Sequence, residues 1–127
     1  MNAKQPVKKP TDRKPKKATV RDVEGGKEVT FPDLVVKDRN GKAVLDDNEK
    51  PTKLKVVLEF DALDDYELVE ELAQLDNRGD LVPSVLRKLV GDQAEAVVNA
   101  HRDERGKAKF SEVRNWILQL LGAFNPS

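Results

Sequence analysis

The spacing of apolar residues changes once along this 127-residue chain, close to residue 60. Before that point Leu54, Val56, Leu58 and Phe60 alternate with mostly polar residues, which is the period of a half-buried strand. From residue 64 to 124 apolar residues recur every three to four positions, as they do in amphipathic helices. This order predicts a small β segment followed by a helical part, an α+β fold that is mainly helical.

The predicted β segment covers residues 27–60. Its first half is rich in β-branched and aromatic residues, but Pro32 removes a ladder donor and predicts an edge strand or two short pieces. Asn40-Gly41 favours a tight hairpin turn, because both positions tolerate a positive φ. Residues 43–45 would then form the return strand.

Four short helices are predicted within residues 64–124, separated by turn residues. Asp64 or Asp65 can cap the first, Pro83 suits the first turn of the second, and Gly91 can end it. Helices this short are marginal in water, so mutual packing must hold them together. The expected core comprises Val56, Leu58, Phe60, Leu68, Leu72, Leu75, Val85, Leu86, Leu89, Val97, Val98, Val113, Ile117, Leu120 and Leu121.

Residues 1–26 are predicted to be a disordered arm rich in lysine and proline, in front of a single domain over 27–127. The chain has equal numbers of basic and acidic residues, yet within 1–21 eight basic residues stand against Asp12 alone, so the body is acidic. Blocks of like charge often serve as interaction tails, which makes nucleic acid one partner of the arm. A solubilising tail is the alternative, since no aromatic residue is present to stack on bases. The candidate nucleic-acid residues are Lys8, Lys9, Lys14, Lys16 and Lys17.

The residue types needed for common enzyme chemistry are scarce. The chain has no cysteine and a single histidine, His101, which is best explained as a helix-end residue. It has no glycine-rich phosphate loop, nucleophile elbow or zinc-protease motif. We therefore predict no catalytic residue, metal or cofactor, and no enzyme activity. No apolar run is long enough to cross a bilayer, which predicts an intracellular protein without a membrane partner.

The last predicted helix is apolar over much of its circumference. Trp116 lies one position away from its main apolar stripe, which leaves a core role and a partner-binding role equally open. The first helix carries three glutamates on its polar side, which are either a solvated face or a surface for a basic partner. The candidate partner-binding residues are Trp116, Leu118, Phe124, Glu67, Glu70 and Glu71.

A family resemblance rests on the stretch that begins at Lys55. Residues 58–73 (LEFDALDDYELVEELA) place an acidic and aromatic step at the start of a helix after a short strand. Residues 79–81 (GDL), 86–91 (LRKLVG) and 103–106 (DERG) follow, and an amphipathic helix over 110–121 ends the pattern. This stretch resembles the tail assembly chaperones of long-tailed bacteriophages (siphoviruses), in particular those of phages that infect actinobacteria.

The resemblance implies a non-enzymatic assembly factor. Such chaperones bind the aggregation-prone tape measure protein and keep it soluble while tail tube subunits polymerise around it. The implied partners are the tape measure protein, then tail tube subunits and further copies of the chain. The implied location is the cytoplasm of the infected bacterial host, with the chaperone absent from the mature virion. No individual site residue is carried over by this resemblance.

Two readings from other classes stand beside it. The first is a small phage nucleic-acid-binding protein that uses the basic arm, whose affinity would fall steeply with salt. The second is a structural virion component such as a helical head–tail connector. Salt-dependent binding would favour the first, and recovery of the chain from purified virions would favour the second.

Overall fold

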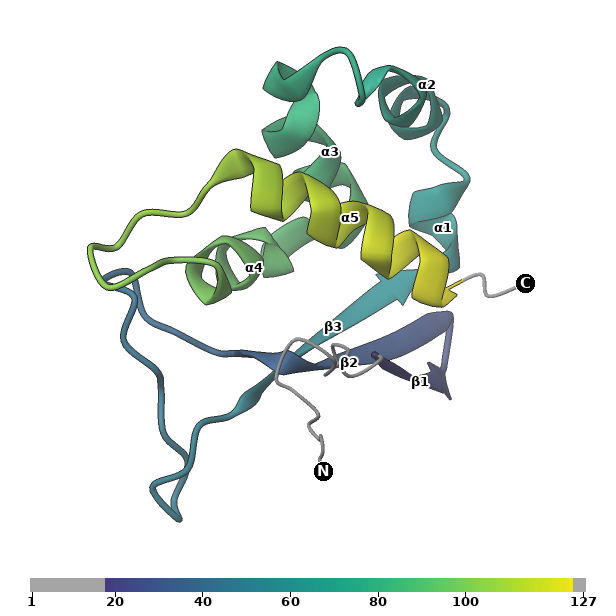
Figure 1. Ribbon diagram of the computed structural model, residues 1–127. Helices are drawn as coiled ribbons and strands as arrows, with labels where there is room; N and C mark the ends of the chain where they lie inside the picture. The colour runs from purple at the N-terminus through teal and green to yellow at the C-terminus, as the bar shows by residue number, and fades with distance from the viewer. Residues whose placement is uncertain (1–17, 125–127) are drawn as a thin grey trace, which may run out of the picture.

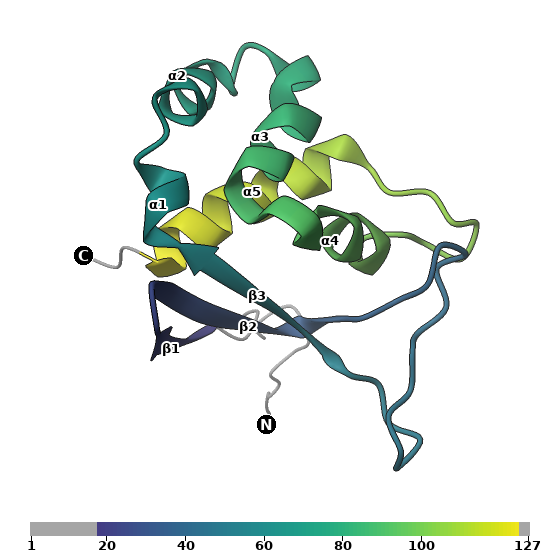
Figure 2. The ribbon, with the colours of Figure 1, turned by 180° about the vertical axis from the view of Figure 1, so that it is seen from behind.

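The computed structural model describes residues 18–124, which form an antiparallel sheet covered on one face by helices (Figure 1). Viewed from behind, the helices again lie on a single side of the sheet (Figure 2). The strands pair in the order β1-β2-β3, and the predicted α+β class is confirmed. The elements are β1 (Thr19–Val23), β2 (Gly26–Val35), β3 (Lys53–Glu59), α1 (Phe60–Leu63), α2 (Tyr66–Gln74), α3 (Val82–Val90), α4 (Ala94–Ala100) and α5 (Phe110–Phe124), with 3-10 turns at Gly79–Leu81 and Gly91–Gln93.

Strand β1 lies inside residues 1–26, so the expected boundary of the disordered arm is wrong. β1 pairs with β2 from Thr19↔Thr30 to Val23↔Gly26, and Arg21 Nη2 lies 2.9 Å from Glu28 Oε1. The sequence hides this strand because its side chains are mostly exposed and include charged residues, which gives no apolar alternation. Lys8, Lys9, Lys14, Lys16 and Lys17 lie outside the described residues.

Pro32 lies in the central strand, not in an edge strand or between two short pieces. β1 pairs only with residues 26–30, so β2 has already lost this neighbour where Pro32 occurs. The pairing with β3 is also irregular between Phe31 and Val35. The missing amide donor therefore falls where β2 has one neighbour and a disturbed register, which is how a central strand tolerates proline.

The core lies between the sheet and the helices. Alternate residues of β3 (Leu54, Val56 and Leu58) are fully buried, as the two-residue period predicts. Phe60 is wrong as a core residue: it begins α1, where the strand period stops, and it is half-exposed. Three further expected core residues, Leu72, Val98 and Leu121, are only partly buried. Further buried apolar residues, outside the expected core set, are Val29, Phe31, Leu54, Val82, Val90, Ala100 and Trp116.

Three turns of the chain have the same geometry, each beginning with aspartate and ending with lysine four residues later. They span residues 38–42, 46–50 and 103–107. In each, the aspartate Oδ1 accepts hydrogen bonds from the amides two and four residues ahead, at 2.8–3.0 Å. The fourth position has a positive φ, filled by Gly41, Glu49 and Gly106. The Asn40-Gly41 turn is thus confirmed, but residues 43–45 form only isolated bridges, Lys37↔Ala43 and Leu45↔Pro51.

The connection between β2 and β3 extends away from the body of the molecule (Figures 1 and 2). We call residues 36–52 the projecting loop. Its base is fixed to the turn after α4, because Lys37 Nζ donates to the carbonyl of Arg102 at 2.8 Å. Every residue from 42 to 53 is exposed, so this segment is held by its own hydrogen bonds.

Candidate protein-binding surface

Helix α2 turns apolar side chains in two directions. Asp65 caps it, its Oδ1 accepting from the amide of Leu68 at 3.0 Å, which fixes the start of the helix. Leu68 and Leu75 are fully buried. Tyr66 and Val69 lie three positions apart on a different side and are 78% and 53% exposed. The helix therefore presents a second apolar strip to solvent.

The three glutamates predicted on this helix do not form one free surface. Glu67 and Glu70 are exposed. Glu71 is partly buried, and its Oε2 accepts a hydrogen bond from Lys88 Nζ of α3 at 2.7 Å. That hydrogen bond lowers the pKa of Glu71 and raises the pKa of Lys88. Glu71 thus joins α2 to α3. Glu67 Oε1 lies 3.9 Å from the same Lys88 Nζ, but its side chain is 74% exposed, so this pair contributes little and Glu67 and Glu70 form the exposed acidic surface.

Trp116 belongs to the core, so its assignment as a partner contact is wrong. It is 2% exposed, and its ring lies 5.1 Å from that of Phe31 and 6.3 Å from that of His101. From its position one residue off the apolar stripe of α5, the Trp116 ring contacts Phe31 of β2. The indole Nε1 is buried and has no acceptor among the described residues.

The other two α5 candidates behave differently. Phe124 is half-buried, packed edge-on against Phe60 with ring centres 5.6 Å apart, and Lys27 Nζ lies 5.3 Å from its ring centre. Leu118 is 48% exposed and shares its side of the helix with the exposed Phe110, eight residues earlier. Of the three candidate partner-binding residues on α5, Leu118 is therefore the one that is exposed and accessible to a partner.

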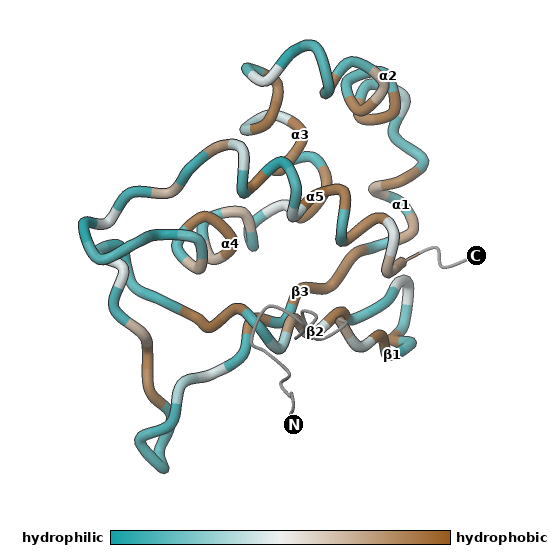
Figure 3. Tube along the Cα trace, in the orientation of Figure 1, coloured by the Kyte–Doolittle hydropathy of each residue, from teal (hydrophilic) through white to brown (hydrophobic). Residues whose placement is uncertain are grey.

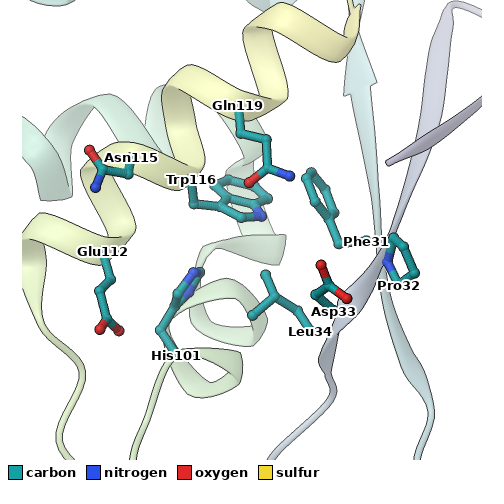
Figure 4. Close-up of a pocket in the computed structure, with 9 residues that line it drawn as sticks. All are labelled: Phe31, Pro32, Asp33, Leu34, His101, Glu112, Asn115, Trp116 and Gln119. Atoms are coloured by element: carbon teal, nitrogen blue, oxygen red, sulfur yellow. The ribbon is translucent and has the colours of Figure 1, made fainter. Parts of the chain in front are cut away.

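A hollow of about 610 Å³ lies beside Trp116, between β2, α5 and the end of α4 (Figure 4). His101 Nδ1 lies 2.8 Å from the carbonyl of Val97, which orients the ring along its own helix. Burial lowers the pKa of His101, so the ring is neutral at neutral pH. The lining residues are Phe31, Pro32, Asp33, Leu34, His101, Glu112, Asn115, Trp116 and Gln119.

Comparisons with protein-family models, with curated proteins and with solved structures find no match to this chain. Within residues 18–124 no group of three or more histidine, aspartate or glutamate side chains is placed to hold a metal ion. No helix in the same range is long and apolar enough to cross a membrane. The feature that the geometry does define is the exposed strip of α2, with its acidic neighbours and the open side of α5.

Proposed function

We propose that this chain is a non-enzymatic tail assembly chaperone of a long-tailed bacteriophage. It binds the tape measure protein and keeps it soluble while the tail tube polymerises around it. It acts in the host cytoplasm and leaves before the virion is complete. The observation that carries the proposal is the outer side of α2, where Tyr66 and Val69 are exposed beside the exposed Glu67 and Glu70.

This surface suits a long helical client. Exposed apolar residues three positions apart match the three-to-four-residue spacing of an amphipathic helix laid against them. Tyrosine supplies a large contact area at a small cost in conformational entropy. Leu118 and Phe110 add apolar area on α5, and both α2 and α5 pack around α3. The neighbouring glutamates would pair with basic residues of the client and disfavour aggregation of the free chaperone.

Co-expression with the tape measure protein of the same phage tests the proposal. We expect the chain to keep that client soluble and to copurify with it at low and high salt, because apolar contacts resist screening. Val69→Asp places a charge in the exposed strip and should abolish copurification. Val44→Asp, which charges another exposed valine on the projecting loop (44% exposed, against 53% for Val69), is the matched control and should leave client binding intact.

Two results would overturn the proposal. One is a client that precipitates while the chain retains nucleic acid at low salt only, which assigns function to the basic arm. The other is recovery of the chain in purified virions, which assigns it a structural role. Equal loss of client binding in both valine variants would remove α2 as the contact surface.

A further inference from the structure

The projecting loop is preorganised although every residue from 42 to 53 is exposed. The amide of Val36 donates to Thr52 at 2.7 Å, and that of Val44 donates to Val36 at 2.9 Å. At the tip, Asp46 Oδ1 accepts from the amides of Asn48 and Lys50. These bonds fix one loop conformation before any partner arrives, which reduces the entropy lost on binding.

The loop carries apolar and acidic residues that the fold does not use. Val44 and Leu45 are adjacent, and they are 44% and 53% exposed. Figure 3 shows this as an apolar stretch on the loop, well separated from the core. Asp47 and Glu49 lie at the tip, and both are exposed. Single exposed apolar residues are ordinary. Here two neighbours lie together on an ordered projection, beside acidic residues, which makes this loop a candidate contact surface.

A groove with the opposite charge runs between α3 and α4, with a volume of about 410 Å³. Its apolar floor comes from Pro83, Leu86, Ala94 and Val98. Three arginines and one glutamate surround that floor, in a body that is otherwise acidic: Arg39, Arg87, Arg102 and Glu95.

The three arginines differ in how firmly they are engaged. Arg102 is fixed by donating to Asn99 Oδ1 and to the carbonyl of Gly106, both at 2.7 Å. Arg39 lies 3.8 Å from Glu95, with both side chains largely exposed, so this pair contributes little. No ion pair to Arg87 is found among residues 18–124. Arg87 and Arg39 are therefore the guanidinium groups that can bind an incoming carboxylate.

We propose that this groove binds the projecting loop of a second copy of the chain. Val44 and Leu45 would cover the apolar floor, and the tip carboxylates of Asp47 and Glu49 would meet the arginines. A nucleic-acid phosphate would pair with the arginines but would leave the apolar floor uncovered. The projecting loop instead carries apolar and acidic residues at nearby positions. The interface is separate from the α2 strip and rests on no part of the proposed function.

The placement of the groove fits a reciprocal exchange. Arg39 lies in the 38–42 turn, near the base of the projecting loop. The acidic residues Asp47 and Glu49 lie at the tip of the same loop. The base is fixed to the body through Lys37 and Arg102, so a loop directed away from the body does not fold into its own groove. If the projecting loops of two copies lie side by side and run in opposite directions, the tip of each loop lies at the base of the other. That arrangement has two-fold symmetry and predicts a closed dimer.

Sedimentation of the full chain over a wide concentration range tests this interface. We expect a monomer–dimer equilibrium that weakens as salt is added. Arg87→Glu and Asp47→Arg should each weaken association about tenfold or more, because each opposes like charges across the contact. The double variant should recover most of the loss. Leu45→Asp should also give monomers, because it places a charge on the apolar floor of the groove.

Two controls occupy equivalent positions elsewhere. Glu104 holds the same place in the 103–107 turn that Asp47 holds in the 46–50 turn, so Glu104→Arg should leave the dimer unchanged. Arg105→Glu reverses an exposed arginine outside the groove and should also have no effect. A chain that is monomeric at every concentration overturns the proposal, as does a dimer that survives Arg87→Glu and Leu45→Asp. Dimers lost equally in the controls would place the contact outside the groove.

Discussion

Gly41 is a residue whose identity the fold requires. Its φ is +85°, and a Cβ built there would lie 2.0 Å from the carbonyl oxygen of Asp103, so the 38–42 and 103–107 turns touch backbone to backbone. Gly41→Ala should lower the free energy of unfolding by more than about 2 kcal/mol, because alanine is strained in the left-handed backbone conformation and its Cβ would clash with Asp103. Urea denaturation measures this loss. Gly25→Ala, with a φ of +78° and open space around it, is the control and should cost about 1 kcal/mol. Equal losses would mean that the two turns do not need close contact.

His101 gives the chain a dependence on mild acid. Burial lowers its pKa below the usual 6.5, outweighing the hydrogen bond to Val97 and the charge of Glu112, which raise the pKa. Since the unfolded chain then binds the proton more readily, stability is full above about pH 6.5 and falls as pH drops below that value. Urea denaturation between about pH 7.5 and 5.5, above the carboxylate range, should show this slope. His101→Gln should flatten it, and an unchanged slope in that variant would assign the effect to other groups.

The role of Trp116 shows what residue spacing leaves undecided. Helical periodicity places it beside the apolar stripe of α5, and both a core residue and an exposed contact satisfy that position. The deciding fact is that β2 passes next to it and supplies Phe31, with ring centres 5.1 Å apart. That neighbour is 85 positions away in the sequence, and local pattern carries no information about it.

At the scale of elements, Gln93 closes the edge of the sheet. Its side-chain oxygen accepts from the amide of Val57 at 2.8 Å, and its nitrogen donates to the carbonyls of Val57 and Val90 at 2.8 and 3.0 Å. One side chain thus satisfies the outer backbone groups of β3 and joins them to the α3–α4 corner. Gln93→Ala should destabilise the fold by about 1–3 kcal/mol, because it leaves those groups without partners. Gln74→Ala on exposed α2 is the control and should change stability little. Thermal denaturation measures both, and equal shifts would remove Gln93 from this role.

Elements with a local signature could be predicted, and those defined by distant partners could not. The four longer helices follow from apolar residues every three to four positions, and Asp65, one of the two expected caps, is the residue that accepts from Leu68. β1 exists because Thr19 to Val23 pair with β2, although its own side chains show no alternation. Of the candidate surface, Glu67, Glu70 and Leu118 are exposed as expected. Glu71 is engaged because Lys88, 17 residues away, happens to face it.

At the scale of the whole molecule, truncation tests where along the chain the folded unit begins. Among the described residues the buried core begins at Val29, with Ala18 packed against it, so we expect that removing residues 1–17 leaves the free energy of unfolding close to that of the full chain. Removing residues 1–25 also deletes β1 and its ladder to β2. It should cost about 2–4 kcal/mol, from several hydrogen bonds at about 0.5–1.5 kcal/mol each. It would also expose the edge of β2 and promote aggregation.

Urea denaturation of the two truncated chains, with light scattering to follow association, measures this difference. Equal stability of both would mean that β1 contributes nothing to the fold, and equal loss in both would place part of the folded unit before residue 18. Removing residues 1–17 also separates the function of the basic arm from that of the folded body. This truncation removes seven basic residues and Asp12. If it still keeps the tape measure protein soluble, client binding belongs to the folded body, and any salt-sensitive nucleic-acid retention that it loses belongs to the arm.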